Sequence, residues 1–350
     1  MPQSSEFTVP EGKRTPPWIR NQRSFPIRWI AAHAVRYWYL GLVMLVGAIS
    51  NAGLASVVPI YLGRAMDALL ENPPRTEVLG NIALFILGTQ VLRGFLQFAR
   101  NFGSELLGQH LERNIRHELY VSLLGKSMTY HNLQPVGDVM ARATNDVREI
   151  NFMFSPGINL VVGSANFILM PLILSVNYHP ALITAPLVFL ILYFLSLWQY
   201  LHELNPITEA VRKAFGELNT RLAEVVDGIE TVKGMAQEES EVDLFAENAQ
   251  RFRDRNVKQG DVEARFLPLL IMGLTQAGGL YHAIYLFQNG ALKVGDVVGY
   301  FGLLLLFGFP TFVSLFAYSQ VSLGVAGARR ILELINRETE LDQNVAGYDQ

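Results

Sequence analysis

Few residues in the sequence have the type and spacing of a catalytic or metal site. The string nearest to a phosphate-binding P-loop is GKS at residues 125–127, but Tyr120 stands where that motif needs its first glycine, and no strand pattern precedes it. His110 and His117 share a helical face without the further ligands that a metal ion needs. The chain has no cysteine, which excludes disulfides and thiolate sites. We therefore expect no catalytic residue, no metal site and no ATP hydrolysis by this chain alone.

Polar and aromatic residues inside long apolar stretches are better candidates for a functional role. Arg93 interrupts such a stretch, and an intramembrane arginine commonly faces a cavity or a partner, unless its head group reaches the interface. Asn159 and Asn166 lie on one helical face, where hydrogen bonding between helices is a simpler role than contact with a substrate. An amphipathic cavity would be lined by these three residues together with Gln276, Tyr281, His282, Phe309, Phe312 and Phe316, which otherwise are ordinary packing residues.

The apolar stretches that hold these residues are long enough to cross a membrane. A spanning helix needs about 20 mostly apolar residues, because the bilayer core is about 30 Å thick and a helix rises about 1.5 Å per residue. Only 17% of the 350 residues are charged, against about 25% in soluble proteins. Stretches of sufficient length occur at residues 37–62, 78–99, 152–176, 181–201, 266–287 and 297–325. The sequence therefore predicts an all-α membrane protein with six transmembrane helices.

The distribution of positive charge predicts how these helices are oriented. Lysine and arginine are retained on the cytoplasmic side of a membrane. Of the 28 in the chain, all but four precede the first span, follow the sixth, or lie between spans two and three or four and five. The opposite side has Arg64, Arg75 and Lys293. Both termini are therefore predicted to be cytoplasmic in a multi-pass protein of the plasma or inner membrane, and the net charge of −3 gives no indication of nucleic-acid binding.

Two predicted cytoplasmic segments, residues 100–151 and 202–265, are too long for simple loops. Each carries apolar residues at helical spacing: Leu107, Leu111, Ile115, Leu119 and Leu123 in the first, and Leu218, Leu222, Val225, Ile229 and Val232 in the second. Helices that continue the spans by about 25 residues would reach nearly 40 Å beyond the membrane. Each segment breaks near its midpoint, at residues 130–137 and 234–240. We therefore predict two antiparallel helical hairpins with short tips.

The order of motifs along the chain resembles the transmembrane half of ABC (ATP-binding-cassette) exporters. Residues 113–150, which include SMTYHNLQPVGDV and ATNDV, resemble the first intracellular loop of that family. Residues 228–245 (GIETVKGMAQEESEVDLF) resemble the second loop. Residues 290–296 (GALKVGD) and 326–335, which end in ARRILELI, resemble the last span and its exit. The resemblance covers about residues 27–340, and its specificity comes from the order and spacing of motifs that are individually loose.

The resemblance implies how the chain is coupled to ATP hydrolysis. The two tips would be coupling helices seated on nucleotide-binding domains, with the contact residues Tyr130, His131, Asn132 and Leu133 in the first tip and Gly234, Met235, Ala236, Gln237 and Glu238 in the second. The implied partners are a second six-span chain in a homodimer or heterodimer, fused or separate nucleotide-binding domains, a hydrophobic or amphipathic substrate, and the lipid bilayer. ATP and Mg²⁺ would bind to the nucleotide-binding domains, since this chain has no cofactor site of its own.

Residues outside the six spans complete the predicted domain organisation. The proline-rich, polar residues 1–26 are predicted to be disordered. Residues 27–36 are predicted to form an amphipathic elbow helix on the membrane surface. The six-span domain would occupy residues 37–335, and residues 336–350 would be a linker toward a nucleotide-binding domain. That family usually fuses this domain after the last span, so we expect the sequence to have been cut before it.

Three other classes of membrane protein compete with the hypothesis of an ATP-driven exporter. A secondary carrier driven by an ion gradient is expected to have acidic residues and broken helices at the membrane midplane, but the six apolar stretches contain no Asp or Glu. A membrane enzyme needs clustered histidines or carboxylates near the interface, and the seven histidines are scattered. A membrane scaffold without transport remains the third possibility, which binding of an ATPase domain to the two tips would exclude.

Overall fold

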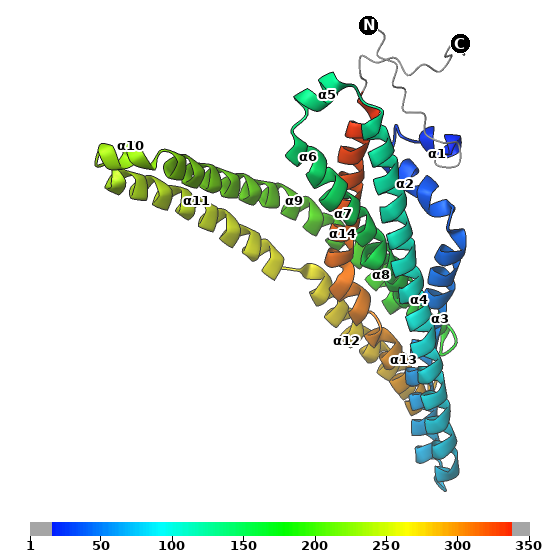
Figure 1. The fold of residues 1–350 in the computed structure, drawn as a ribbon. Helices are drawn as coiled ribbons and strands as arrows, with labels where there is room; N and C mark the ends of the chain where they lie inside the picture. Colours follow the sequence, from blue (N-terminus) through cyan, green and yellow to red (C-terminus); the bar gives the residue numbers. More distant parts are fainter. Residues whose placement is uncertain (1–15, 338–350) are drawn as a thin grey trace, which may run out of the picture. The chain divides into compact units, whose positions relative to one another are not determined.

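The computed structural model describes residues 16–337, and this part of the chain contains helices and turns without any strand (Figure 1). Six of its continuous helical segments are long and apolar enough to cross a membrane: Trp38–Leu70, Thr76–Leu124, Val136–Ser175, Pro180–Asp227, Glu238–Gln288 and Val294–Asn336. The predicted all-α, six-span fold is therefore confirmed. Residues 1–15 of the predicted disordered segment and residues 338–350 of the predicted linker lie outside the described residues.

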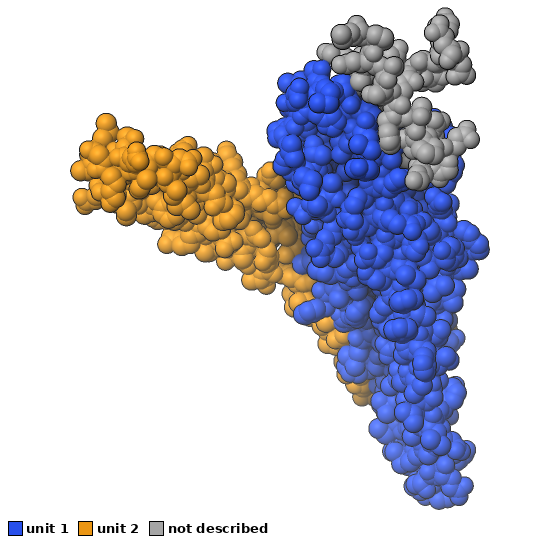
Figure 2. All heavy atoms as spheres, in the orientation of Figure 1, with its two compact units in different colours: residues 1–178, 290–350 blue, residues 179–289 orange. Residues whose placement is uncertain are grey.

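The chain forms two compact units, which Figure 2 colours separately. The first unit comprises residues 1–178 and 290–350, and the second comprises residues 179–289. The helices of the first unit are α1 (Pro17–Arg20), α2 (Pro26–Val35), α3 (Trp38–Leu70), α4 (Thr76–Leu124), α5 (Met128–Leu133), α6 (Val136–Ala141), η2 (Arg142–Asp146), α7 (Val147–Phe152), η3 (Met153–Ile158), α8 (Asn159–Ser175), α13 (Val294–Leu305) and α14 (Gly308–Asn336). Those of the second unit are η4 (Pro180–Ile183), α9 (Thr184–Asp227), α10 (Ile229–Gly234), α11 (Glu238–Ala264) and α12 (Leu267–Gln288).

The N-terminal segment is more ordered than the sequence predicts. Residues 17–20 lie within the predicted disordered segment but form the short helix α1, whose Ile19 is buried in the main hydrophobic core. The free energy gained when the Ile19 side chain is buried is larger than the preference of the proline-rich segment for disorder. Residues 26–35 form the helix α2, which starts one residue earlier than the predicted helix because Pro26 suits the first turn of a helix, and its place on the membrane surface stays a prediction.

Helix α4 is much longer than a membrane crossing. Its 49 residues correspond to about 74 Å, more than twice the thickness of a bilayer core of about 30 Å. The segment contains no proline, so every backbone N–H beyond the first turn can pair along the helix, and the helix ends where the chain reaches Gly125. The prediction that the second span continues as a helix beyond residue 99 is therefore confirmed.

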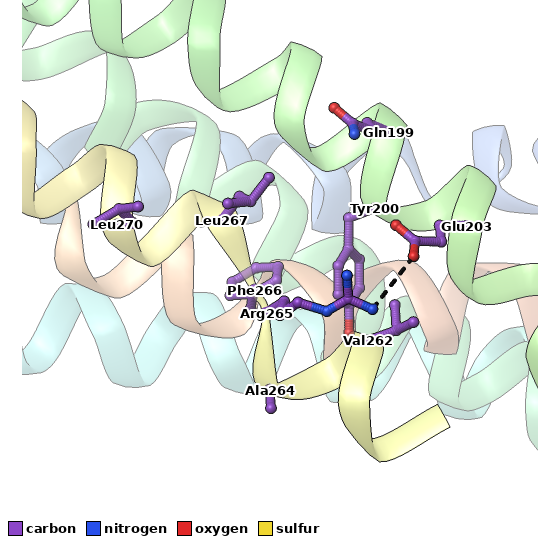
Figure 3. Close-up of a pocket in the computed structure, with 9 residues that line it drawn as sticks. All are labelled: Gln199, Tyr200, Glu203, Val262, Ala264, Arg265, Phe266, Leu267 and Leu270. Carbon is purple, nitrogen blue, oxygen red and sulfur yellow. Dashed lines mark ion pairs between the residues drawn. The ribbon is translucent and has the colours of Figure 1, made fainter. Parts of the chain in front are cut away.

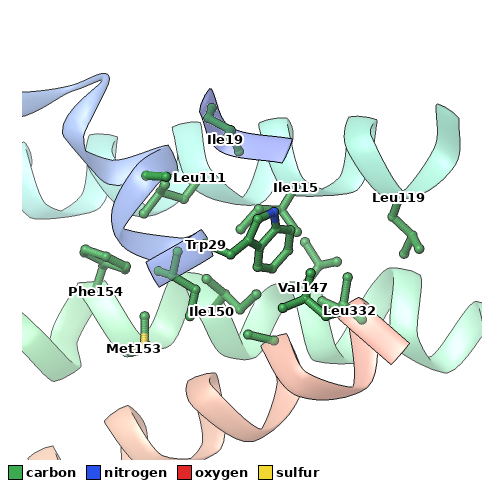
Figure 4. Close-up of a cluster of buried hydrophobic side chains, with 14 of the residues drawn as sticks. Ile19, Trp29, Leu111, Ile115, Leu119, Val147, Ile150, Met153, Phe154 and Leu332 are labelled. Atoms are coloured by element: carbon green, nitrogen blue, oxygen red, sulfur yellow. The ribbon is translucent and has the colours of Figure 1, made fainter. Parts of the chain in front are cut away.

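A core resembling that of a soluble protein surrounds the extended part of α4 (Figure 4). Leu107, Leu111, Ile115 and Leu119 of the predicted apolar stripe are at most 4% exposed. They pack in one cluster with residues of several other helices, which include Trp29 and Ile30 of α2, Val147 and Ile150 of α7, and Ala328, Ile331 and Leu332 of α14. Spacing at every fourth residue places these side chains on one face of α4, and this face joins the four helices.

Two other features shape the first unit. The third span is interrupted between α7 and α8, where Ser155 has non-helical dihedral angles (φ −126°, ψ 98°) just before Pro156. The second feature is the close contact between helices α3 and α13. A Cβ atom added to Gly63 or to Gly295 would clash with the carbonyl oxygen of the other residue. Asp67 accepts a hydrogen bond from the backbone N–H of Gly295 (2.7 Å) and fixes that contact.

We predict that Leu111→Ala destabilises the protein by about 2 to 5 kcal/mol, because it removes a fully buried side chain and leaves a cavity. Leu124→Ala, on the same helix but 44% exposed, is the matched control and is expected to have a small effect. The measurement is thermal unfolding of the purified protein in detergent. Equal loss of stability in the two variants would show that the stripe does not hold the helices together.

Candidate functional site: two helical tips

The first tip is the six-residue helix α5 with the residues that follow it as far as Val136. The Ser127 hydroxyl caps the helix by accepting a hydrogen bond from the backbone N–H of Tyr130 (3.2 Å). The helix ends at Leu133 because Gln134, which precedes Pro135, adopts an extended conformation. The tip thus lies between the end of α4 and the start of α6, as the break predicted at residues 130–137 indicates.

The side chains of the first tip divide into an exposed apolar set and one buried ring. Met128, Leu133 and Val136 are 71%, 75% and 75% exposed, and we call them the first tip surface. Tyr130 is only 6% exposed and belongs to the main hydrophobic core. Exposed apolar residues grouped on a short helix are typical of a contact surface. Leu133 therefore has the exposure expected of a partner contact, whereas Tyr130 faces inward and positions the tip.

Cations surround the ring of Tyr130 and connect the tip to the end of α14. The Lys126 ammonium lies 5.6 Å from the ring centroid, and the Arg337 guanidinium carbon lies 5.9 Å from it. Lys126 also donates a hydrogen bond to the backbone carbonyl of Ile335 (3.0 Å), close to the negative end of α14. Burial raises the pKa of the Tyr130 phenol, so the ring stays neutral beside these two cations. His131 bonds the carbonyl of Leu123 (3.0 Å), so it contacts the end of α4.

A second set of polar contacts ties the segment after the first tip to α14. Arg330 donates two hydrogen bonds to the carboxylate of Asp146, at 2.9 Å and 2.6 Å. Arg142 donates to the backbone carbonyl of Arg330 (2.8 Å) and lies 3.5 Å from Glu333. The first tip and the end of the last span are therefore held as one body within the first unit.

Glu118 forms a buried polar cluster that attaches the N-terminal segment to α4. Its carboxylate accepts hydrogen bonds from Arg23 (2.8 Å) and Trp29 (3.4 Å) and bonds His33 at 2.8 Å. Glu118 lies 19 residues beyond the apolar stretch that ends at residue 99, outside the membrane-spanning part of α4. Burial raises the pKa of this carboxyl, but the hydrogen bond from His33 and the charge of Arg23 outweigh burial and hold the pKa below its usual value.

The second tip, residues 229–237, closes the hairpin formed by α9 and α11 in the second unit. Within it, the short helix α10 is followed by a turn in which Ala236 has a positive φ of 51°. Met235 is 69% exposed. Glu238 starts α11 and pairs with Lys233 (3.1 Å), and an ion pair between Arg221 and Glu241 joins the two long helices. A backbone hydrogen bond at the helix start, followed by Lys233, lowers the pKa of the Glu238 carboxyl.

Of the predicted contact residues of the second tip, Gly234 ends α10, Met235, Ala236 and Gln237 form the turn that follows, and Glu238 starts α11. The acidic residues Glu238, Glu239 and Glu241 occupy the first turn of α11, where carboxylates are favoured by the helix dipole. The short helix itself lies earlier, at Ile229–Gly234, than the break predicted at residues 234–240. Gly228, which separates α9 from α10, is the sequence signal for this earlier boundary.

The predicted cavity residues are found in both units. In the first unit, Arg93 donates to Asn51 (2.7 Å) and Gln90 (3.0 Å), and Asn159 donates across helices to Asn101 (3.1 Å). The remaining members in this unit are Asn166, which bonds its own helix at Val162, and Phe309, Phe312 and Phe316, each at least 41% exposed. The members in the second unit are Gln276, Tyr281, which is 75% exposed, and His282, which lies 3.4 Å from Thr184. That these residues line one substrate cavity stays a prediction.

A pocket of about 380 Å³, which no sequence pattern predicts, lies in the second unit where α11 ends and α12 begins (Figure 3). Arg265 and Glu203 approach to 3.7 Å at its wall, and Tyr200 packs edge-on against Phe266. The other lining residues are Gln199, Val262, Ala264, Leu267 and Leu270. Among the described residues no three His, Cys, Asp or Glu side chains gather as metal ligands. The pocket is amphipathic and holds no arrangement of catalytic groups.

Six helical segments that are long and apolar enough to span a bilayer define a multi-pass membrane protein. The family model for the ABC transporter transmembrane region matches residues 41–311, so the chain belongs to this family.

Curated relatives match most of the chain. An ABC transporter ATP-binding protein of Bacillus subtilis described as uncharacterized, YknU, is 23% identical over 311 residues, which cover 87% of this chain and 51% of that protein. A probable multidrug resistance ABC transporter ATP-binding/permease protein of the same species, YheI, is 26% identical over 318 residues, with 87% and 53% covered. An ATP-dependent lipid A-core flippase of Nitrosococcus oceani is 23% identical over 326 residues, with 91% and 52% covered. The chain thus spans about half the length of these relatives.

We predict that Glu118→Gln lowers stability at neutral pH by about 3 kcal/mol, because Arg23 and His33 lose a buried anionic partner. The pKa of Glu118 is lower in the folded than in the unfolded chain, so its contribution is present above about pH 4.5 and is lost as the pH falls through the folded value. The difference between wild type and variant in thermal unfolding should therefore be largest at pH 7 and shrink below pH 4.5. A difference that is constant with pH would contradict this role.

Proposed function

We propose that this chain is the membrane-spanning part of an ATP-driven exporter and forms the path of a hydrophobic or amphipathic solute. The observation that carries the proposal is the combination of helices that extend beyond the bilayer with short tips that expose apolar side chains. Relatives described as a multidrug resistance transporter and a lipid A-core flippase support an amphipathic substrate. The helical extensions would convert movement at the tips into reorientation of the spans.

The two tips are the proposed contacts with nucleotide-binding domains. The first tip surface is apolar and the second tip carries Met235 beside the Lys233–Glu238 pair, so the two tips suit grooves of different polarity. Among the predicted contact residues, Leu133, Met235 and Glu238 would touch the domains directly. Tyr130 would act through its packing, because its ring is buried. ATP and Mg²⁺ would be bound by those domains, whether they are fused to this chain or separate.

Pairing with a second six-span chain and the orientation in the membrane also belong to the proposal. The charge distribution supports cytoplasmic termini and tips, in a plasma or inner membrane. A pair of such chains, alike or different, would enclose a central cavity that opens to one side of the membrane at a time. Binding of ATP would favour the state in which the nucleotide-binding domains are closed on one another.

We predict that Leu133→Asp weakens binding of the nucleotide-binding domain by about tenfold or more, because a charge replaces an apolar hot-spot contact. Met140→Asp on α6, also exposed and apolar, is the matched control and should change binding less than about twofold. Binding is measured by titration of the domain into the chain in nanodiscs, and transport of a fluorescent amphiphile is measured in proteoliposomes of the complete transporter. Unchanged binding and transport in Leu133→Asp would refute the coupling role of the first tip.

A further inference from the structure

Arg100 on α4 is a buried cation that takes part in none of the ion pairs and hydrogen bonds described above for the fold and the two tips. It is 3% exposed, and its Nε and Nη1 atoms have no hydrogen-bond partner among residues 16–337. No ion pair within that part of the chain includes it. The nearest acidic residue along α4, Glu105, instead accepts hydrogen bonds from Ser155 (2.8 Å) and Gln109 (2.9 Å). A buried charge without hydrogen bonds or a counter-ion is unfavourable, so a group that pairs with this guanidinium would be stabilising.

Arg93 lies two helical turns earlier on α4, and side chains of the same chain accept hydrogen bonds from its guanidinium. Its Nε and Nη1 atoms donate to the amide oxygens of Asn51 and Gln90. The amide of Asn51 in turn donates to Gln97. Neutral amide dipoles thus surround Arg93, whereas Arg100 has no such neighbours bonded to it. The two residues form a natural pair for comparison, with one guanidinium satisfied and the other unsatisfied.

Glycines on two neighbouring helices make room for Arg100. A Cβ atom on Gly47 of α3 would lie 2.8 Å from the Cβ of Arg100, and one on Gly163 of α8 would lie 3.0 Å from its Nη1. The guanidinium is therefore held against the backbone of α8. One turn before Gly163 lies Asn159, whose Oδ1 atom is also buried without a partner. Arg100 on α4 and Asn159 on α8 thus each have buried polar atoms without a hydrogen-bond partner.

The position of Arg100 in the chain indicates what kind of group would complete it. It directly follows the apolar stretch 78–99, so in the proposed orientation it lies at the cytoplasmic boundary of the bilayer, where the acidic groups of amphiphiles lie. Water could satisfy its donors but would not balance its charge. An oxyanion does both, since charged hydrogen bonds from a guanidinium to a carboxylate or phosphate are strong and geometrically defined.

We propose that Arg100 binds the carboxylate or phosphate group of an anionic amphiphile that enters between α3, α4 and α8. This inference deepens the proposed transport function, because it names an anionic head group as a feature of the ligand. The ligand is either the transported solute or an acidic lipid of the inner leaflet. Both present the same oxyanion to Arg100, while Arg93 keeps its amide partners and does not take part in binding.

The test compares dodecyl phosphate with the uncharged dodecyl maltoside as ligands of the chain in nanodiscs made of neutral lipid, without nucleotide. Wild type should be stabilised against thermal unfolding by dodecyl phosphate and not by dodecyl maltoside. Arg100→Gln should lose about tenfold or more of the affinity for dodecyl phosphate. Without the ligand, Arg100→Gln should be as stable as wild type or more stable, since it removes an unbalanced buried charge. A structural arginine would instead lose stability with and without ligand.

Three variants control the experiment. Arg93→Gln should keep selective binding of dodecyl phosphate, and Arg100→Lys should keep part of it. Gly163→Ala keeps the charge but narrows the space beside Nη1, so it should weaken binding even if Arg100→Gln does not fold. Undiminished binding of dodecyl phosphate by both Arg100→Gln and Gly163→Ala would overturn the proposal.

Mass spectrometry of lipids that copurify with the chain distinguishes the two sources of the oxyanion. An acidic phospholipid retained by wild type and lost in Arg100→Gln identifies the bilayer as the source. Selective binding of dodecyl phosphate without a retained acidic lipid identifies a solute. Because no step needs ATP or a nucleotide-binding domain, failure of this inference is separate from failure of the proposed ATP-driven transport.

Discussion

A helix that leaves the bilayer must change what its sides contact, and α4 does so within a single unbroken segment. In its membrane part the side chains of Phe95 and Phe98 are about 70% exposed in the isolated chain, as suits contact with lipid or with another subunit. Beyond it, one stripe from Leu107 to Leu119 is buried while the other faces become polar. This stripe binds α2, α7 and α14 to α4, and the arrangement of the first unit outside the membrane depends on it.

Polar contacts then fix the ends of the elements that the apolar core brings together. Glu118 holds the N-terminal segment, Asp146 pairs with Arg330, and Lys126 contacts the end of α14. The first tip therefore stands on a frame that also contains the exit of the last span. Packed side chains and ion pairs, rather than a flexible loop, therefore connect the tip to the rest of the first unit. The proposed coupling requires such a connection, because it needs a movement of the tip to reach the spans.

The sequence predicts much of this organisation because strong, repeated signals carry it. Six apolar stretches fix the spans, and the spacing of Leu107, Leu111, Ile115 and Leu119 fixes the extension of α4. The inward orientation of Tyr130 was not predictable, since a six-residue helix is too short to have an apolar period. From the sequence alone Arg100 belongs with the predicted cytoplasmic charges, because its burial depends on Gly47 and Gly163 of other helices. The sequence predicts disorder at residues 17–20, since a single buried isoleucine leaves no pattern.

Helix α4 continues as one helix well beyond the length of a membrane crossing, and a distance measured along it shows whether this extension is rigid. The 350 residues contain no cysteine, so Phe102→Cys and Leu124→Cys, at exposed positions, allow spin labels to be placed specifically. For 22 residues of continuous helix, double electron–electron resonance should give a narrow distribution of distances centred at about 33 Å between the labelled backbones. A broad distribution, or a mean far below that length, would show that the segment bends or unfolds and that α4 is not a rigid helix over this range.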